Sequence, residues 1–275
     1  MKTIYNSRKS PDRTLTNQEK YEHAQLRHHR LVVAVRLLIF VLFLAVWEFA
    51  AYMGYIDAFF FSSPSRVALC FWDMVKDGTF FTNTGITLLE TVASFLLVLL
   101  IGMLSATLLW YSARCSEILE PYLVVLNSLP KSALAPLFIV WLGTGINTII
   151  VAGISVAIFG SIINLYTGFR QVDEEKIKLI YTLGGNKRNA FLKVVLPGSI
   201  PTVLSNMKVN IGLALVGVVI GEFLAARRGL GYLIIYGSQV FQLNMVITSI
   251  MILCIIAMAL YQMIQALEHY YQKKI

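Results

Sequence analysis

Two lysines stand inside long apolar runs, where a charged side chain needs a partner or water. Lys131 and Lys208 each lie about ten residues past the inner end of an apolar run, which at about 1.5 Å per residue places both ammonium groups near mid-membrane. A lysine at that depth costs about 2.5–3.5 kcal/mol on insertion scales, so each should face a wet cavity or a partner. Amide side chains lie within a turn of them, at Asn127, Asn206 and Asn210. These residue types can bind and guide an anion without covalent chemistry.

The same apolar runs contain other features that a ligand could use. Pro130 and Pro136 interrupt the helical hydrogen bonds of the third run and expose backbone groups. Two interpretations of the lysines remain open: they line a transport path, or their long stems carry the ammonium groups towards the inner face. Glu222 ends the fifth run, where pairing with Arg227 or Arg228 is an adequate structural account.

Several other kinds of chemistry lack the residues they require. No Gly-x-x-x-x-Gly-Lys-Ser/Thr phosphate-binding motif occurs, so the chain should not bind and hydrolyse ATP by itself. Cys70, Cys115 and Cys254 lie far apart and have no metal or disulfide spacing. No His/Asp, Ser/Lys or metal constellation is apparent, which disfavours an intramembrane enzyme. The buried acids Glu90 and Glu222 motivate a competing hypothesis, a secondary carrier driven by an ion gradient.

The elements that position these residues are membrane-spanning helices. The chain has 275 residues, of which 57% are hydrophobic and only 14% charged, and this composition is typical of a polytopic membrane protein. Six runs are each close to the roughly 20 residues that cross the hydrocarbon, so we expect an all-α fold with six transmembrane helices. The expected spans are 31–53, 84–109, 119–142, 146–168, 200–224 and 245–267.

The basic residues indicate how these spans are oriented. With the amino end inside, the inner segments carry 17 lysines and arginines and the outer segments carry 4. This bias predicts that both termini are cytoplasmic, and it assigns the net charge of +8 to membrane topology rather than to nucleic acid. We expect residues 1–30 to form a basic cytoplasmic tail and residues 31–275 to form one domain in the lipid bilayer.

Short segments between the spans also have recognisable patterns. The sequence Ser-Ser-Pro-Ser at residues 62–65 caps an amphipathic stretch that runs through Met74, which predicts a short helix lying at the outer surface. Gly229 and Gly231 predict a turn into a second short outer helix. Gly217 and Gly221 put small residues on one face of the fifth span, which favours tight packing inside the protomer over a dimer seam.

The longest polar interruption, residues 178–201, predicts two short helices joined by a tight bend. Apolar residues recur with helical spacing on either side of Gly184 and Gly185, and glycine adopts a sharp bend without a side-chain clash. Pro197 and Pro201 should end the second helix. The resulting compact, partly apolar segment is where we expect the protein to meet a soluble partner.

This segment resembles the EAA loop in the membrane subunits of bacterial ABC importers. The pattern of that loop is Glu-Ala-Ala, three residues, Gly, nine residues, Ile, one residue, Leu-Pro; Gly184, Val194, Leu196 and Pro197 match it, and residues 178–180 replace the Glu-Ala-Ala. The stretches FFFSSPSRV, LNSLPKSALAPLFIVWLGTG and GEFLAARRGLGYLI also look like permeases of the nitrate, sulfonate and taurine type. The resemblance extends from about residue 47 to the last span.

The resemblance implies a type I ABC-importer permease in the bacterial inner membrane, with a coupling loop at about residues 170–199. It implies two copies of this chain, two separate ATPase subunits that bind ATP and magnesium, and an extracytoplasmic solute-binding protein; this chain itself would bind no cofactor. The residues expected to couple to the ATPase are Ile180, Leu183, Gly184, Gly185, Phe191, Val194, Leu196 and Pro197. In the family the segment that contains Glu222 borders the outer gate. With the two lysines and the polar groups near them, this gives the expected pathway residues Asn127, Pro130, Lys131, Asn206, Lys208, Asn210 and Glu222.

The expected solute is a small anion such as a sulfonate or nitrate, because two desolvated lysines would attract negative charge. A vitamin precursor or another neutral or cationic heterocycle, carried by related permeases, is the alternative. The resemblance does not choose between them.

Overall fold

The computed structural model describes residues 17–273 and divides the chain into two units, one ending at Pro64 and one beginning at Ser65. The described part of the first unit consists of α1 (Asn17–Tyr52) and the short helix α2 (Ala58–Phe61). The helix α1 begins at Asn17, 14 residues before the expected first span at residue 31. That segment lacks glycine and proline and is rich in helix-forming residues, so the helix continues through it. Residues 1–16 of the predicted tail lie outside the described residues.

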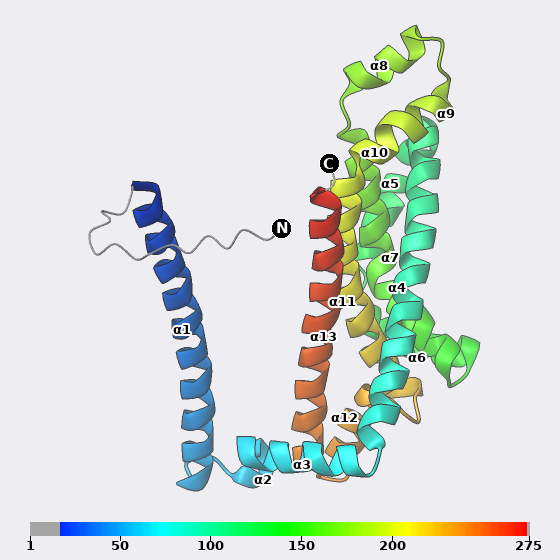
Figure 1. Ribbon diagram of the computed structural model, residues 1–275. Coiled ribbons are helices and arrows are strands. Elements are labelled where there is room, and N and C mark those ends of the chain that lie inside the picture. The colour runs from blue at the N-terminus through cyan, green and yellow to red at the C-terminus, as the bar shows by residue number, and fades with distance from the viewer. Residues whose placement is uncertain (1–16, 274–275) are drawn as a thin grey trace, which may run out of the picture. The chain divides into compact units, whose positions relative to one another are not determined.

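The second unit is a bundle of helices, and the part described contains no strand (Figure 1). Its central helices are α4, α7 and α11, with α13 packed on α11 and α12. The helices of this unit are α3 (Pro64–Lys76), α4 (Thr79–Tyr111), α5 (Ala113–Ser128), α6 (Lys131–Leu142), α7 (Ile146–Arg170), α8 (Glu174–Thr182), α9 (Lys187–Ala190), the π-helix η1 (Phe191–Val195), α10 (Leu196–Gly198), α11 (Ile200–Ala225), α12 (Leu230–Gln239) and α13 (Leu243–Gln272).

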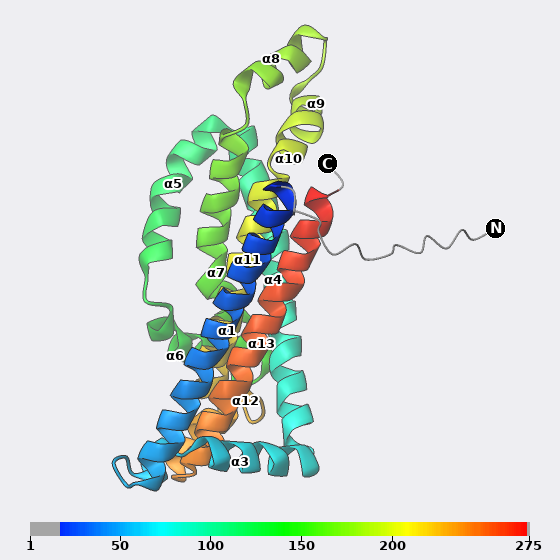
Figure 2. The same cartoon turned by 60° about the vertical axis from the view of Figure 1, so that its left-hand side comes forward.

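Within residues 17–273, five helices are long and apolar enough to cross a membrane, and the bent pair of α5 and α6 supplies a sixth candidate span. The predicted span at 119–142 is therefore broken: α5 and α6 meet at 95° around Leu129 and Pro130 (Figure 2). Pro130 breaks the helix as expected, because proline lacks the amide donor that continues it. Pro136, by contrast, lies inside α6 without ending it.

Small residues allow the central helices to approach closely. A methyl group on Gly217 of α11 would lie 2.7 Å from the Cα atom of Gly153 on α7, and one on Gly221 would lie 2.9 Å from the Cα atom of Ile149. These positions pack inside the protomer, as the sequence favoured. Glycine removes the side chain that would otherwise keep two membrane helices apart.

The second unit has two ends that carry different short elements (Figures 1 and 2). We call the end with residues 171–199 the loop end, and the end with α3, α12 and residues 226–229 the platform end. The predicted short helices at the platform end are both confirmed, as α3 and α12. Gly229, just before α12, has a φ of 115°, which explains why glycine occupies this turn.

Candidate functional site

The loop end begins with α8, which lies on the surface. The side chain of Asp173 caps this helix by accepting a hydrogen bond from the Glu175 amide at 2.9 Å. No residue of α8 is buried. Several apolar side chains on one side of it are open to solvent, since Leu179 is 57%, Tyr181 45% and Leu183, just after the helix, 75% exposed. An exposed apolar surface of this kind on a short, capped helix is typical of a contact site for another protein.

The bend predicted at the two glycines is confirmed, and its hydrogen bonds define a Schellman turn. Gly184 has a φ of 79°, and its amide donates to the carbonyl of Tyr181 at 3.0 Å. The amide of Gly185 donates to the carbonyl of Ile180 at 2.9 Å. A methyl group on Gly185 would lie 2.8 Å from that same carbonyl oxygen. Both glycines are therefore required by the geometry that ends α8.

The second helix of the loop continues past Pro197, which was expected to end it, and stops before Pro201, the other expected end. Asn186 caps α9 by accepting from the Asn189 amide at 2.9 Å, and the chain then continues through η1 into α10. In η1 the Leu196 amide donates to the carbonyl of Phe191, five residues earlier. This wider turn tolerates Pro197, which has no amide to donate, so the helical path reaches Gly198.

We expected Phe191 to be one of the residues that couple to the ATPase, but its side chain lies inside the protein. It is only 6% exposed and packs against helices of the bundle, whereas Ile180, Val194 and Leu196 are partly buried. The residues that could contact a partner are therefore concentrated on α8 and the turn after it.

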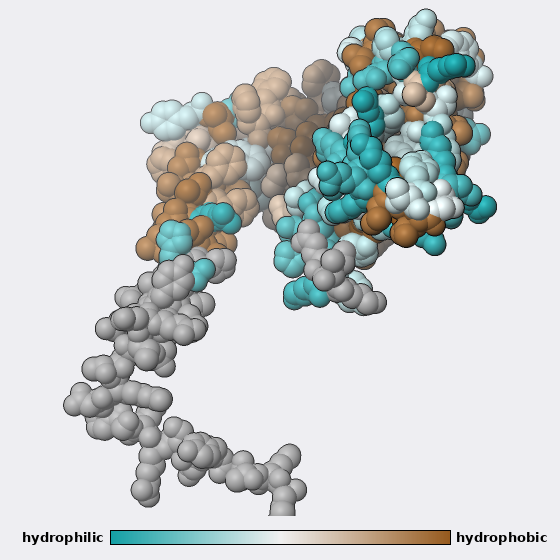
Figure 3. All heavy atoms as spheres, turned by 90° about the horizontal axis from the view of Figure 1, so that it is seen from above, coloured by the Kyte–Doolittle hydropathy of each residue, from teal (hydrophilic) through white to brown (hydrophobic). Residues whose placement is uncertain are grey.

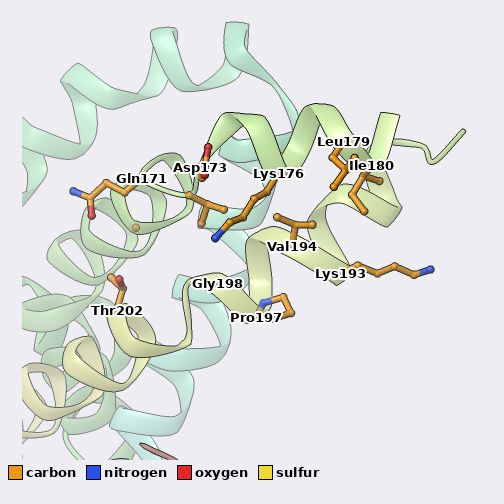
Figure 4. A pocket seen from close by; sticks show the side chains of 12 residues that line it. Gln171, Asp173, Lys176, Leu179, Ile180, Lys193, Val194, Pro197, Gly198 and Thr202 are labelled. Carbon is orange, nitrogen blue, oxygen red and sulfur yellow. The ribbon is translucent and has the colours of Figure 1, made fainter. Parts of the chain in front are cut away.

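A cleft of about 730 Å³ separates α8 from the segment that leads into α11 (Figure 4). Lys176 extends from α8 towards this space, while Lys193 points away from it. Seen from above, the same end of the unit carries hydrophilic side chains interleaved with apolar ones (Figure 3). The residues that line the cleft are Gly168, Gln171, Val172, Asp173, Lys176, Leu179, Ile180, Lys193, Val194, Pro197, Gly198 and Thr202.

Both lysines have hydrogen-bond partners within the protomer. The ammonium group of Lys131 donates to the carbonyls of Leu126 and Asn127 at the carboxyl end of α5. Lys208 on α11 pairs with Glu268 on α13, with 2.7 Å between Nζ and Oε2. A cation at a helix carboxyl terminus and an ion pair between helices are both structural roles.

The asparagines expected beside the lysines form a separate buried cluster. The side-chain amides of Asn206 and Asn210 both donate to the hydroxyl of Ser161 on α7, at 2.9 and 2.8 Å. The Oδ1 atom of Asn206 is buried without a hydrogen-bond partner among the residues described. Asn127 stays exposed on α5, close to the position of Gly160. The residues predicted to line one pathway therefore lie in several separate places.

Glu222 lies at the platform end and is fully buried. Its carboxylate accepts hydrogen bonds from the hydroxyl of Thr87 and the amide of Gly231, both at 2.6 Å. Neither Arg227 nor Arg228 forms an ion pair with it among the residues described, so pairing with a neighbouring arginine does not explain its position. Asn83 lies one turn before Thr87 on α4 and accepts a hydrogen bond from the amide of Gly229 at 2.7 Å. Helices α4 and α11 together therefore hold the start of α12.

The sequence did not predict the hydrogen-bond partners Asn83, Thr87, Ser161 and Glu268 of the groups described above. Each lies 45 to 146 residues away from the group it contacts. The one signal available was a polar side chain within an apolar run, and that signal names no partner.

Comparison with known proteins decides the family. Residues 98–269 match the sequence profile of the binding-protein-dependent transport system inner membrane component. The chain belongs to this family. It is 31% identical over 233 residues to a probable ABC transporter permease protein of Haemophilus influenzae, an alignment that covers 85% of this chain and 94% of that protein. It is 28% identical over 233 residues to the putative aliphatic sulfonates transport permease protein SsuC of Bacillus subtilis, covering 84% of each.

Solved structures agree with this assignment at the level of the fold. An inward-facing MetNI methionine ABC transporter matches with a TM-score of 0.55 and 17% identity, over 66% of this chain and 92% of that chain. An amino acid ABC transporter matches with a TM-score of 0.57 and 18% identity, over 74% and 98%. The ABC-importer permease has the predicted helical fold, and permeases of this family are transport subunits rather than enzymes.

Proposed function

We propose that this permease docks its ATPase subunits through α8 and the turn after it. The observation that carries the proposal is the exposed apolar surface of Leu179, Tyr181 and Leu183 on a helix that buries none of its own residues. The Schellman turn at Gly184 fixes the direction of this surface. The orientation proposed from the charge bias, with both termini inside, places the loop end in the cytoplasm, where ATP is available.

In the assembled importer we propose two copies of this chain, two ATPase subunits and an extracytoplasmic binding protein. ATP closes the ATPase dimer, the docked loops move with it, and the helices carry that motion to the platform end. The buried acids Glu90 and Glu222 suggested a carrier driven by an ion gradient as the alternative. Family membership supports the ATP-driven importer over that carrier.

The solute proposed is small and delivered by the binding protein, and the structure weakens the argument that it is an anion. That argument depended on Lys131 and Lys208 facing the path, and both are engaged elsewhere. Related permeases bear the names aliphatic sulfonates, taurine, formylaminopyrimidine and riboflavin, which differ in charge and size. We therefore propose a small organic solute without assigning the sign of its charge.

Recovery of the ATPase with purified permease tests the docking proposal. Leu183→Ser removes apolar surface from the docking turn, and ATPase recovery should fall while insertion of the permease is unchanged. Leu192→Ser is the matched control, because Leu192 is 47% exposed on the loop but lies outside both α8 and the turn after it. Equal ATPase recovery with both variants would refute the assignment of α8.

A further inference from the structure

The two halves of the loop are attached to the bundle in different ways. α8 buries no residue, whereas Ala190 and Val195 of the second half are fully buried and Phe191 is nearly so. The cleft between α8 and residues 193–202 removes direct packing over much of the first half. Apart from Ile177, which packs against the buried cluster, α8 is joined to the bundle mainly through its two chain connections and the second half of the loop.

Phe191 fills an aromatic cluster at the loop end of α4 and α7. Its ring centroid lies 5.1 Å from that of Trp110 and 5.6 Å from that of Tyr111, the last two residues of α4. It lies 5.5 Å from the ring of Phe169 on α7, nearly edge to face. Aromatic pairs in this distance range have directional preferences in addition to their buried area, so the cluster fixes the position of the Phe191 ring.

Lys187 makes a second, polar attachment to the same helix end. Its ammonium group donates to the carbonyl of Tyr111 at 2.9 Å and lies 5.6 Å from the ring centroid of Trp110. The last carbonyls of a helix find no amide donor within the helix and carry its partial negative charge. Lys187 of the loop therefore supplies a hydrogen-bond donor and a positive charge to the carboxyl end of α4.

We infer that Phe191 and Lys187 are positioning residues that transmit the movement of the docked loop to α4 and α7. This inference rests on the proposed function and adds a division of labour to it: α8 binds the ATPase, and residues 187–195 pass the movement on. Phe191 and Lys187 contact neither solute nor nucleotide in this scheme. α4 also contacts α12, so it links the cluster directly to the platform end.

The experiment uses the complete importer, with the permease purified together with its ATPase subunits. The three native cysteines are replaced, and a cysteine is introduced at Ser238, an exposed residue of α12 at the platform end. The measurements are ATPase recovery, basal ATP hydrolysis, and the rate at which a maleimide labels position 238 with and without ATP and magnesium. The variants are Phe191→Ala, Phe191→Tyr, Lys187→Met and, as a matched exposed control, Leu192→Ala.

Phe191→Ala and Lys187→Met should retain ATPase recovery and basal hydrolysis but lose the ATP-dependent change in labelling at position 238. Phe191→Tyr keeps the ring and should keep the change, as should Leu192→Ala. Lys187→Met leaves the buried core untouched, so it tests the inference even if Phe191→Ala fails to fold.

The division of labour would be overturned by a wild-type labelling response in either Phe191→Ala or Lys187→Met, or by loss of ATPase recovery in Lys187→Met. An absent labelling response in the unmodified complex would also count against it, because no movement would then reach the platform end. Failure of the proposed function itself looks different, since Leu183→Ser and Leu192→Ser would then recover equal amounts of ATPase.

Discussion

Replacing Gly217 by alanine should force α11 away from α7 at the centre of the bundle. The added methyl carbon would lie 2.7 Å from the Cα atom of Gly153 and 2.8 Å from the carbonyl oxygen of Ala152. Carbon atoms in favourable contact are about 3.5–4.0 Å apart, so the helices would have to separate by about 1 Å. Both closest atoms belong to backbone, and a side-chain rotation therefore cannot relieve the clash.

The magnitude follows from two opposing effects. Overpacking a well-packed core typically costs about 1–3 kcal/mol. Alanine in place of glycine favours a helix by about 0.8–1.0 kcal/mol. We therefore expect Gly217→Ala to lower the free energy of unfolding by up to about 2 kcal/mol.

The assay is the thermal unfolding midpoint of the permease in detergent, with Gly212→Ala as the matched control. Gly212 is in the same helix, and a methyl group there would meet no atom within 4 Å. A change of 1 kcal/mol shifts the midpoint by about 2–4 °C for a chain approaching this size. Gly217→Ala should therefore unfold several degrees below Gly212→Ala. If the two midpoints coincide, the close approach of α7 and α11 at Gly217 is not present in the protein.

Three further outcomes follow from particular contacts. Lys208→Met should lower the unfolding midpoint by leaving the Glu268 carboxylate unpaired, and the double variant Lys208→Met/Glu268→Leu should recover part of the loss; additive losses would exclude the ion pair. Glu222→Ala should lower the free energy of unfolding by about 1–3 kcal/mol for each buried donor left without an acceptor, measured as a shift in the midpoint. The pKa of Asp77 is lowered by hydrogen bonds from Thr79, so the ionised carboxylate stabilises the folded protein. This stabilisation should be present at neutral pH and disappear as the pH falls through the lowered pKa. An unfolding midpoint in Asp77→Ala with the same acid dependence as in the wild type would contradict this.

The features that could be predicted from the sequence are those set by local chemistry. The apolar runs predicted the long helices because a span must satisfy its own backbone hydrogen bonds in lipid. Gly184 and Gly185 predicted the bend in the loop, since the left-handed and close backbone positions there require no side chain. Pro130 predicted a break in the third span, although nothing local specified the 95° angle between α5 and α6.

The features that could not be predicted depend on partners distant in the chain. Phe191 has the same helical spacing as the exposed residues of the loop, and only the rings at the ends of α4 and α7 make it a buried residue. Lys208 has the depth expected of a pathway lysine, yet Glu268 lies 60 residues away and neutralises it. Spacing along one helix identifies a face, but it does not identify what covers that face.

A photo-crosslinking amino acid at Tyr181 tests the central claim most directly, because Tyr181 is 45% exposed on α8. The same group at Arg227, an exposed residue of the platform end, is the control. In cells that contain the complete importer, the group at Tyr181 should form an adduct with the ATPase subunit and the group at Arg227 should not. An ATPase adduct at Arg227, with none at Tyr181, would contradict both the docking surface and the orientation of the permease.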